Sequence, residues 1–212
     1  MGVQEGDVVA IILPTCKEFI TSFFAIQLLK ATPVSLYPPT SLAGLSEWNE
    51  KTQSMLECVH ANVCVTDKRI HQVLNQDVQV LVCESLTNKN FDFDFDIEQF
   101  NENQLCFLQF SSGTTGDPKA VKISQKNAIL NAKLISDALP VPNHLITVAS
   151  WLPLYHDMGL VGCLLMSILN GTDIVLIRPE DFIMKPQLWL QAIHDYRITC
   201  TTAPNFAYGL VQ

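Results

Sequence analysis

Basic residues are scarce in this 212-residue sequence, which has 13 Lys and Arg against 21 Asp and Glu and a formal net charge of −8. Binding to a nucleic-acid backbone requires a basic face, so we expect no nucleic-acid partner. Charged residues make up only 16% of the chain, below the roughly 25% usual in globular domains. Apolar runs of about 18 residues are also absent, so the sequence predicts no transmembrane segment.

Cysteine pairs and targeting signals are missing too. The seven cysteines are an odd number, form no CxxC pair and lie mostly inside apolar segments. This pattern indicates buried thiols in a reducing compartment rather than disulfides or zinc ligands. The first six residues, MGVQEG, contain neither basic residues nor an apolar core, so they predict no signal peptide. Together these features predict a cytoplasmic protein.

Three common catalytic motifs are absent as well. The P-loop spacing fails because the fifth residue after Gly113 is Pro118, where that motif has its second glycine. The chain contains no HExxH zinc motif, and neither Ser111 nor Ser112 lies in the GxSxG setting of a nucleophilic serine. The sequence therefore supports none of these three chemistries.

Strand-like and helix-like segments alternate along the chain. Runs rich in β-branched residues predict strands at 7–13, 34–37, 63–66, 78–83, 105–110, 120–123, 145–151, 173–177 and 198–202. Apolar residues at a spacing of three or four predict helices at 15–30 with Thr15 as N-cap, about 45–59, from 68, 125–138, about 156–169, 186–196 and from 204. Polar residues 84–104 are interpreted as a connecting loop, in which the Phe-Asp alternation of 91–96 is compatible with an edge strand. We expect an α/β fold, with a doubly wound, mostly parallel sheet and flanking helices.

The sequence SSGTTGDPK at 111–119 carries the strongest chemical signal. Glycines let the backbone approach a ligand closely, and turned N–H groups and hydroxyls supply donors. Lys119 adds a positive charge for a phosphate. The segment follows a predicted strand, and ligands of parallel sheets bind beyond the carboxyl ends of strands. These residues therefore favour a nucleotide polyphosphate, against the alternative of an ordinary Ser/Thr/Gly surface loop.

The sequence SWLPLYHDMGL at 150–160 is the second unusual stretch. An imidazole at His156, flanked by the apolar Trp151 and Met158, suits a carboxylate bound at the mouth of an apolar channel. The alternative is that Asp157 caps a helix and that His156 is merely a partly buried residue. A metal site at this His-Asp pair is not supported, because the other histidines show no ligand spacing.

Four stretches together resemble one family. SSGTTGDPKAV at 111–121 resembles the phosphate-loop signature of the acyl-adenylate-forming (AMP-binding) superfamily of acyl-CoA synthetases, nonribosomal peptide adenylation domains and luciferases. SWLPLYHDMGLVG at 150–162 is similar to the next signature of its fatty-acyl-AMP ligase branch, which YPP at 37–39 and PNFAY at 204–208 also resemble. The matches occur in order along nearly the whole chain. One departure is Ala120, where the superfamily usually has glycine.

The resemblance implies that a fatty acid is activated to an acyl-adenylate with release of pyrophosphate, using ATP and Mg²⁺. The carboxylate would attack the α-phosphorus in line, and positioning and charge neutralisation would replace a protein nucleophile. The implied catalytic residues are Lys119, which would steady the loop or the pyrophosphate, and His156, beside the carboxylate and the α-phosphate. Trp151 and Met158 would line the acyl channel. The implied phosphate-binding residues, with Thr114 or Thr115 near magnesium, are Ser111, Ser112, Gly113, Thr114, Thr115, Gly116 and Lys119.

The resemblance also implies an incomplete domain. Residues 1–212 look like an internal part of the large N-terminal AMP-binding domain, without a separate C-terminal domain, so the adenine-binding segment and the metal-binding glutamate would follow Gln212. Activity would then belong to a longer enzyme, with an acyl carrier protein or coenzyme A as acceptor. The alternatives are an acyl-CoA synthetase within the same class and, from another class, a truncated non-catalytic remnant or nucleotide-binding module.

Overall fold

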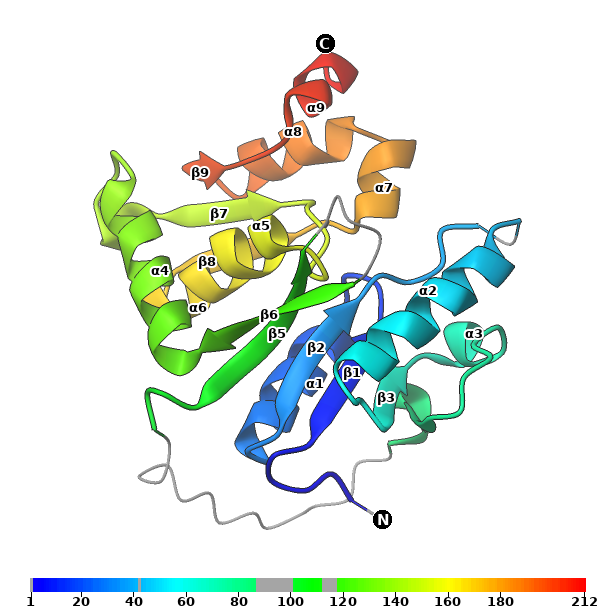
Figure 1. Cartoon of the computed structure of the whole chain (residues 1–212). Coiled ribbons are helices and arrows are strands. Elements are labelled where there is room, and N and C mark those ends of the chain that lie inside the picture. Colours follow the sequence, from blue (N-terminus) through cyan, green and yellow to red (C-terminus); the bar gives the residue numbers. More distant parts are fainter. Residues whose placement is uncertain (1, 42, 87–100, 112–117) are drawn as a thin grey trace. The chain divides into compact units, whose positions relative to one another are not determined.

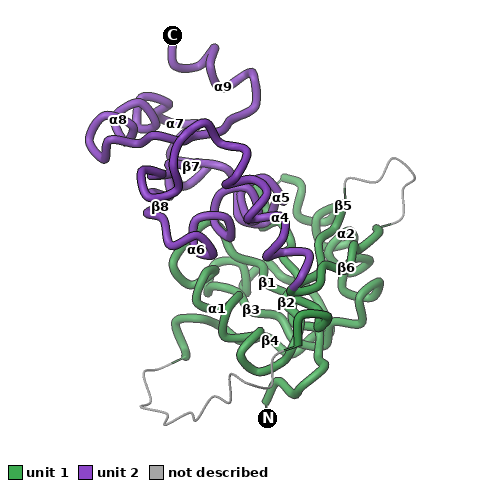
Figure 2. Tube along the Cα trace, turned by 90° about the vertical axis from the view of Figure 1, so that its left-hand side faces the viewer, with its two compact units in different colours: residues 1–125 green, residues 126–212 purple. Residues whose placement is uncertain are grey.

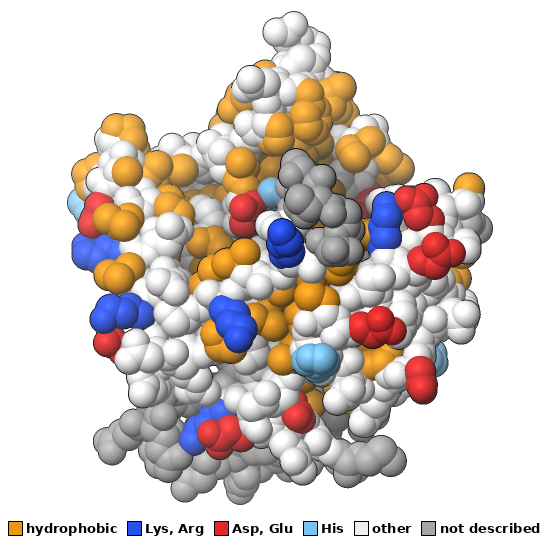
Figure 3. Space-filling view, in the orientation of Figure 1, with side chains coloured by type: hydrophobic (Ala, Val, Ile, Leu, Met, Phe, Trp, Pro, Cys, Tyr) orange, Lys and Arg blue, Asp and Glu red, His pale blue; other side chains and the backbone are white. Residues whose placement is uncertain are grey.

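The computed structural model describes residues 2–41, 43–86, 101–111 and 118–212 (Figure 1). The chain divides into two compact units, Met1–Gln125 and Lys126–Gln212, which are coloured separately in Figure 2. Each unit has its own sheet. None of the described helices has the length and apolar character needed to cross a bilayer. Side chains of both charge signs are interspersed on the face drawn in Figure 3.

Unit 1 is built on a sheet with the strand order β4-β3-β1-β2-β5-β6. All neighbouring strands are parallel except β5 and β6, which are antiparallel. The strands are β1 (Val8–Ile12), β2 (Thr32–Leu36), β3 (Val63–Thr66), β4 (Gln79–Val82), β5 (Leu105–Ser111) and β6 (Lys119–Ser124). The helical segments are α1 (Lys17–Leu28), α2 (Leu45–Cys58), α3 (Lys68–His71) and the 3-10 turn η1 (Cys83–Ser85).

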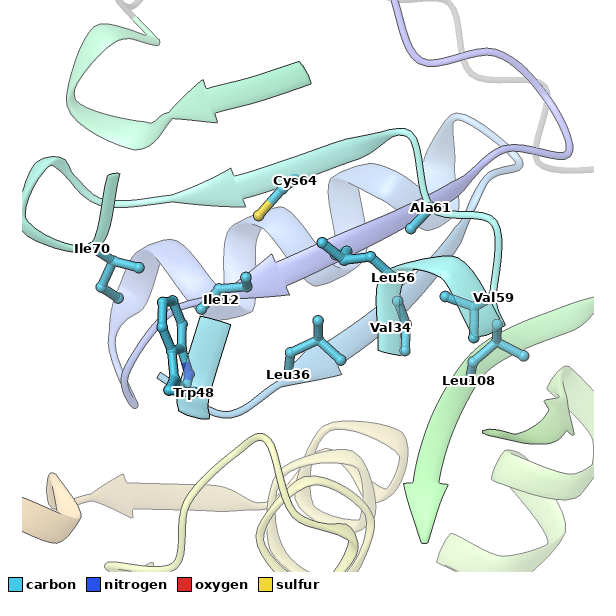
Figure 4. Packing of buried hydrophobic residues seen from close by; sticks show 11 residues of the cluster. Ile12, Val34, Leu36, Trp48, Leu56, Val59, Ala61, Cys64, Ile70 and Leu108 are labelled. Carbon is cyan, nitrogen blue, oxygen red and sulfur yellow. The ribbon is translucent and has the colours of Figure 1, made fainter. Parts of the chain in front are cut away.

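Helices cover both faces of the unit 1 sheet. Leu108 of β5 belongs to the buried cluster that includes Ile12 and the α2 residue Trp48 (Figure 4). Its neighbour Phe107 instead contacts Phe23 of α1, with 5.8 Å between ring centroids. Because successive strand residues point to opposite faces, α1 and α2 lie on opposite sides of the sheet. This is the doubly wound arrangement expected from the sequence.

Unit 2 contains a smaller, fully parallel sheet of order β8-β7-β9. Its strands are β7 (Thr147–Ser150), β8 (Asp173–Leu176) and β9 (Cys200–Thr201). Its helical segments are α4 (Gln125–Ala138), which starts at the unit boundary, η3 (Asn143–Leu145), α5 (Asp157–Gly159), the π-helical η4 (Leu160–Leu165), α6 (Met166–Asn170), α7 (Pro179–Met184), α8 (Gln187–Asp195) and α9 (Asn205–Leu210).

Three aromatic side chains of the unit 2 core, Trp151, Phe182 and Trp189, contact one another. Trp151 stacks on Phe182 with ring centroids 3.9 Å apart and planes 7° from parallel. Trp189 meets Trp151 edge-on at 6.3 Å, and its indole N–H donates a 2.8 Å hydrogen bond to the Thr201 hydroxyl. Aromatic pairs of this kind contribute about 0.5–1.5 kcal/mol beyond the area that they bury. The residue that follows β7, Trp151, is therefore fixed by packing.

The predicted fold class is confirmed, with several local differences, among them the helix α7, which the sequence did not predict. The strands lie in two sheets, and β6 runs antiparallel to β5 because it follows in a hairpin. The prediction of Thr15 as the N-cap of α1 is wrong, because Cys16 occupies the cap position and Thr15 is buried. The backbone of Cys16 is extended, and its side chain makes no capping hydrogen bond. The predicted helix at 156–169 contains the π-helical segment η4. The strand considered at 91–96 lies outside the described residues.

Candidate functional site

The ends of segment 111–119 form the base of a hairpin in unit 1. Ser111 is the last residue of β5 and pairs directly with Lys119, the first residue of β6. Both side chains are exposed. Because β5 is parallel to β2, Ser111 lies at the carboxyl end of a strand of the parallel sheet, where ligands of such sheets bind. Outside the described residues lie Ser112, Gly113, Thr114, Thr115 and Gly116.

A cysteine from α2 contacts the hairpin just before Lys119. The thiol of Cys58 lies 3.2 Å from the carbonyl oxygen of Pro118 and donates a hydrogen bond to it. Cys58 is exposed, so the prediction of buried thiols is wrong at this position, whereas Cys64, Cys106 and Cys163 are buried. Cys58 is exposed because it is the last residue of α2, whose buried residues are Trp48, Thr52 and Leu56.

A small cavity lies beyond the carboxyl end of β2, the neighbour of β5. It has a volume of about 170 Å³, and its lining includes Tyr37, Trp48 and Lys51. The indole N–H of Trp48 donates a 2.9 Å hydrogen bond to the carbonyl of Tyr37, which fixes the start of the YPP turn. Lys51 pairs with Glu47 one helical turn earlier. The YPP stretch thus forms one wall of a cavity at the same edge of the sheet as Ser111.

The turn after β7 carries the second group of predicted residues, in unit 2. The backbone N–H of His156 donates to the carbonyl of Pro153 at 3.2 Å, and the His156 carbonyl accepts from the N–H of Leu160 at 2.9 Å. Gly159 fits closely against this turn, because a Cβ atom there would lie only 2.3 Å from the carbonyl oxygen of Pro153. A glycine at this position therefore lets the helix start directly against the turn, with His156 at their junction.

His156 and Asp157 form an exposed pair. Nδ1 of His156 lies 2.6 Å from Oδ1 of Asp157, and the two side chains are 64% and 68% exposed. The same carboxylate oxygen accepts a 2.7 Å hydrogen bond from the backbone N–H of Met158. His156, not Asp157, occupies the N-cap position of α5. The alternative of a capping Asp157 beside a partly buried histidine is therefore wrong.

Trp151 and Met158 occupy different environments within this segment. Met158 is 43% exposed, whereas Trp151 is 4% exposed inside the aromatic cluster of unit 2. The buried indole N–H of Trp151 has no hydrogen-bond partner in the part of the chain that the structure describes. The role of both residues in an acyl channel stays a prediction.

The structure brings the predicted residues together within each unit. Ser111 faces Lys119 across the hairpin, and Trp151, His156 and Met158 share one strand-to-helix turn. Among the described residues, no group of three or more His, Cys, Asp or Glu side chains could hold a metal ion. Gly159 had no predicted role, and Asp157 was considered only as a helix cap or as part of an unsupported metal pair. The position of Asp157 next to His156 was the available sequence signal for their pairing. The close approach of Gly159 to the Pro153 carbonyl has no signature in a single sequence.

Comparison with known proteins places these residues in context. The family model described as AMP-binding enzyme matches residues 1–212. A protein of Mycobacterium tuberculosis named as a ligase is 31% identical to this chain over 214 residues. The match covers 99% of this chain and 39% of the mycobacterial protein. The medium-chain-fatty-acid–[acyl-carrier-protein] ligase TtuA of Teredinibacter turnerae is 40% identical over 108 residues, 51% of this chain and 17% of TtuA.

Solved structures give the same picture. The fatty acyl-adenylate ligase of Legionella pneumophila, in complex with acyl adenylate and pyrophosphate, matches with a TM-score of 0.87 and 27% identity. The match covers 98% of this chain and 36% of that one. The chain spans 35–39% of the length of the first curated relatives that it matches.

Proposed function

Because this chain belongs to the AMP-binding enzyme family, we propose that it contributes to the ATP-dependent activation of a fatty acid to an acyl-adenylate, with release of pyrophosphate. Fatty-acyl-AMP ligases are among its relatives, and the activity is assigned to the complete gene product. We also propose that residues 1–212 form part of one adenylation domain, acting in the cytoplasm. The seven free thiols suit that reducing compartment.

The observation that carries the proposal is the pairing of Ser111 with Lys119 at the carboxyl end of β5. This pairing places the two ends of SSGTTGDPK side by side, with Lys119 opposite Ser111. In the proposed reaction, residues 111–116 bind the β- and γ-phosphates and Lys119 neutralises charge on the leaving pyrophosphate. Fixed positive charge at a leaving group lowers the barrier without any protein nucleophile.

The second part of the proposal concerns the carboxylate. An oxygen of the fatty-acid carboxylate attacks the α-phosphorus, a new P–O bond forms, and the bond to the bridging oxygen of the β-phosphate breaks. His156 orients the carboxylate, and Trp151 and Met158 form part of the acyl wall. The exposure of His156 supports this role, since its ring is accessible to a ligand.

Magnesium would supply charge neutralisation on the ATP phosphates when bound. The hydroxyl oxygens of Thr114 and Thr115 are of the hard ligand type that this ion prefers. The described residues offer no cluster of acidic ligands. The resemblance implies that the metal-binding glutamate follows Gln212, so an acidic ligand would come from there.

The acceptor of the acyl group is proposed to be an acyl carrier protein. The relative TtuA, named as a ligase of that kind, supports this choice. The rival is an acyl-CoA synthetase. Supplying the complete enzyme and a fatty acid with either coenzyme A or a phosphopantetheinylated carrier protein separates the two, because only the true acceptor becomes acylated.

Fatty-acid-dependent exchange of pyrophosphate into ATP tests the central proposal. We expect exchange with medium- or long-chain acids in the complete gene product. Lys119→Ala should lower it by about 100-fold, a typical loss for one charge-stabilising group. The matched control is Lys122→Ala, because Lys122 is also exposed on β6 but three residues further along the strand. Absence of exchange with every acid would overturn the proposal, and equal losses in both variants would remove the role of Lys119.

A further inference from the structure

Resting on the proposed acyl-adenylate formation, we propose that Asp157 is a positioning residue that holds the His156 ring by Nδ1 and leaves Nε2 for the reacting groups. The distance from Nδ1 of His156 to Oδ1 of Asp157 is 2.6 Å. Nε2 has no hydrogen-bond partner among the described residues. The exposed ring nitrogen is therefore the one available to a substrate.

The carboxylate of Asp157 is itself held in place. Its Oδ1 atom accepts a hydrogen bond from the backbone N–H of Met158 at 2.7 Å and lies 2.6 Å from Nδ1 of His156. A carboxylate oxygen has lone pairs for both bonds. Because the N–H of Met158 belongs to the backbone at the start of α5, the carboxylate is anchored to the same helix start that carries His156.

The backbone of His156 is fixed on both sides of the side chain. Its N–H bonds the Pro153 carbonyl, and its carbonyl accepts from the N–H of Leu160. The close approach of Gly159 to the carbonyls of Leu152 and Pro153 keeps the turn against the helix. With the backbone held, rotation of the ring is the remaining freedom, and the contact with Asp157 favours the rotamer in which Nδ1 faces the carboxylate.

This bond decides which chemistry Nε2 can perform. A histidine has one proton on its ring when neutral and two when charged. With a proton on Nδ1 shared with Asp157, Nε2 accepts a hydrogen bond in the neutral ring and donates one only in the charged ring. A hydrogen bond donated by Nε2 of His156 to a fatty-acid carboxylate therefore requires the doubly protonated ring.

A purely structural role for the pair is weak by comparison. Both side chains are mostly exposed, and exposed ion pairs contribute little to stability. Asp157 can therefore be replaced with little risk of unfolding the chain. Asp137 provides a matched control, because it is also an exposed aspartate of unit 2 and pairs at 2.8 Å with Lys133.

The experiment combines NMR with steady-state kinetics on the complete gene product. Histidine-selective ¹⁵N labelling, with His156→Asn to assign the signal, shows which nitrogen of His156 carries the proton in the neutral ring. We expect the Nδ1–H form in the wild type, in D157N, which keeps an acceptor oxygen, and in D137A. D157A should shift towards the Nε2–H form and lower kcat by about tenfold, the order of loss from modest misplacement.

The outcomes separate this inference from the proposed function. An unchanged His156 tautomer in D157A overturns the positioning role, whether or not the enzyme is active. A changed tautomer with unchanged kcat overturns the link between positioning and reaction. A wild type that forms no acyl-adenylate overturns the proposed function, and the tautomer measurement then still decides whether Asp157 orients the ring. Rescue of kcat in D157N relative to D157A supports the full inference.

Discussion

Both units carry their candidate residues at the carboxyl end of a strand, but they support that strand differently. In unit 1, Ser111 ends β5 within a six-stranded sheet whose aliphatic cluster lies mostly on other strands and on α2. In unit 2, Ser150 ends β7 within a three-stranded sheet, and the next residue, Trp151, is itself part of the core. The pair Ser111 and Lys119 is thus exposed and outside the core of unit 1, whereas the candidate residue Trp151 is itself a core residue of unit 2.

This difference predicts how far the effects of a core substitution will extend in each unit. In unit 1, Ser111 and Lys119 are exposed and are paired with each other through β5 and β6. In unit 2, one stack of rings fixes the residue that begins the His156 turn. We therefore expect core substitutions to reach the candidate site in unit 2 but not in unit 1.

The largest expected effect is that of Phe182→Ala. Phe182 is fully buried against Trp151, and removal of a buried ring costs about 3–5 kcal/mol. We expect hydrogen exchange of residues 147–165 to accelerate strongly. Phe23→Ala in unit 1 is the matched change, because Phe23 is equally buried. It should lower overall stability but leave the amides of Ser111 and Lys119 protected, and loss of that protection would break the comparison.

The second effect separates two glycines of the same helical stretch. Gly159→Ala places a Cβ 2.3 Å from the Pro153 carbonyl oxygen, and such overpacking costs about 2 kcal/mol. Gly162→Ala meets nothing nearer than the Met158 Cγ atom at 3.9 Å, so it should be neutral or stabilising by about 0.5 kcal/mol. Urea denaturation of both variants measures the difference. Equal stabilities would mean that the turn does not rest on the helix at Gly159.

The smallest effect concerns alkaline pH and falls mainly on unit 1. Burial raises the pKa of the Cys64 and Cys106 thiols from 9.0 to about 12. Their stabilising contribution is therefore complete below pH 9 and is lost as the pH rises towards 12, because the unfolded chain ionises first. Between pH 9 and pH 10, each of these two thiols should lower the free energy of unfolding by about 1 kcal/mol. Chemical denaturation of Cys64→Ala and the wild type at pH 8 and 10 should give a shallower pH dependence for the variant; parallel slopes would contradict it.

The sequence predicted most elements because they depend on local patterns. Runs such as DVVAIIL and VCVT produced strands where expected, and the predicted fold class followed from their alternation with helices. The π-helical segment Leu160–Leu165 could not be predicted, since LVGCLL is apolar throughout and carries no period. Neither could the stack of Trp151 on Phe182, which joins residues far apart in sequence.

Candidate site residues were predictable to a different degree in each unit. The composition of 111–119 indicated an anion-binding segment, and the structure adds that Ser111 and Lys119 pair across its base. His156 was found from its setting, but its bond to Asp157 depends on side-chain rotation, which adjacency alone does not determine. The contact of Gly159 with Pro153 depends on how closely a helix meets a turn, and no residue pattern encodes that distance.

The aromatic stack also gives the molecule a convenient optical label. The three tryptophans are Trp48 in unit 1 and Trp151 and Trp189 in unit 2. The rings of Trp151 and Trp189 are 6.3 Å apart and inclined by 75°, so their electronic transitions couple and give a paired circular-dichroism band whose sign depends on their handed arrangement. Trp48, bonded through its indole N–H to Tyr37, belongs to the other unit. The intrinsic spectrum of the protein therefore contains a signal specific to the core that borders the His156 turn.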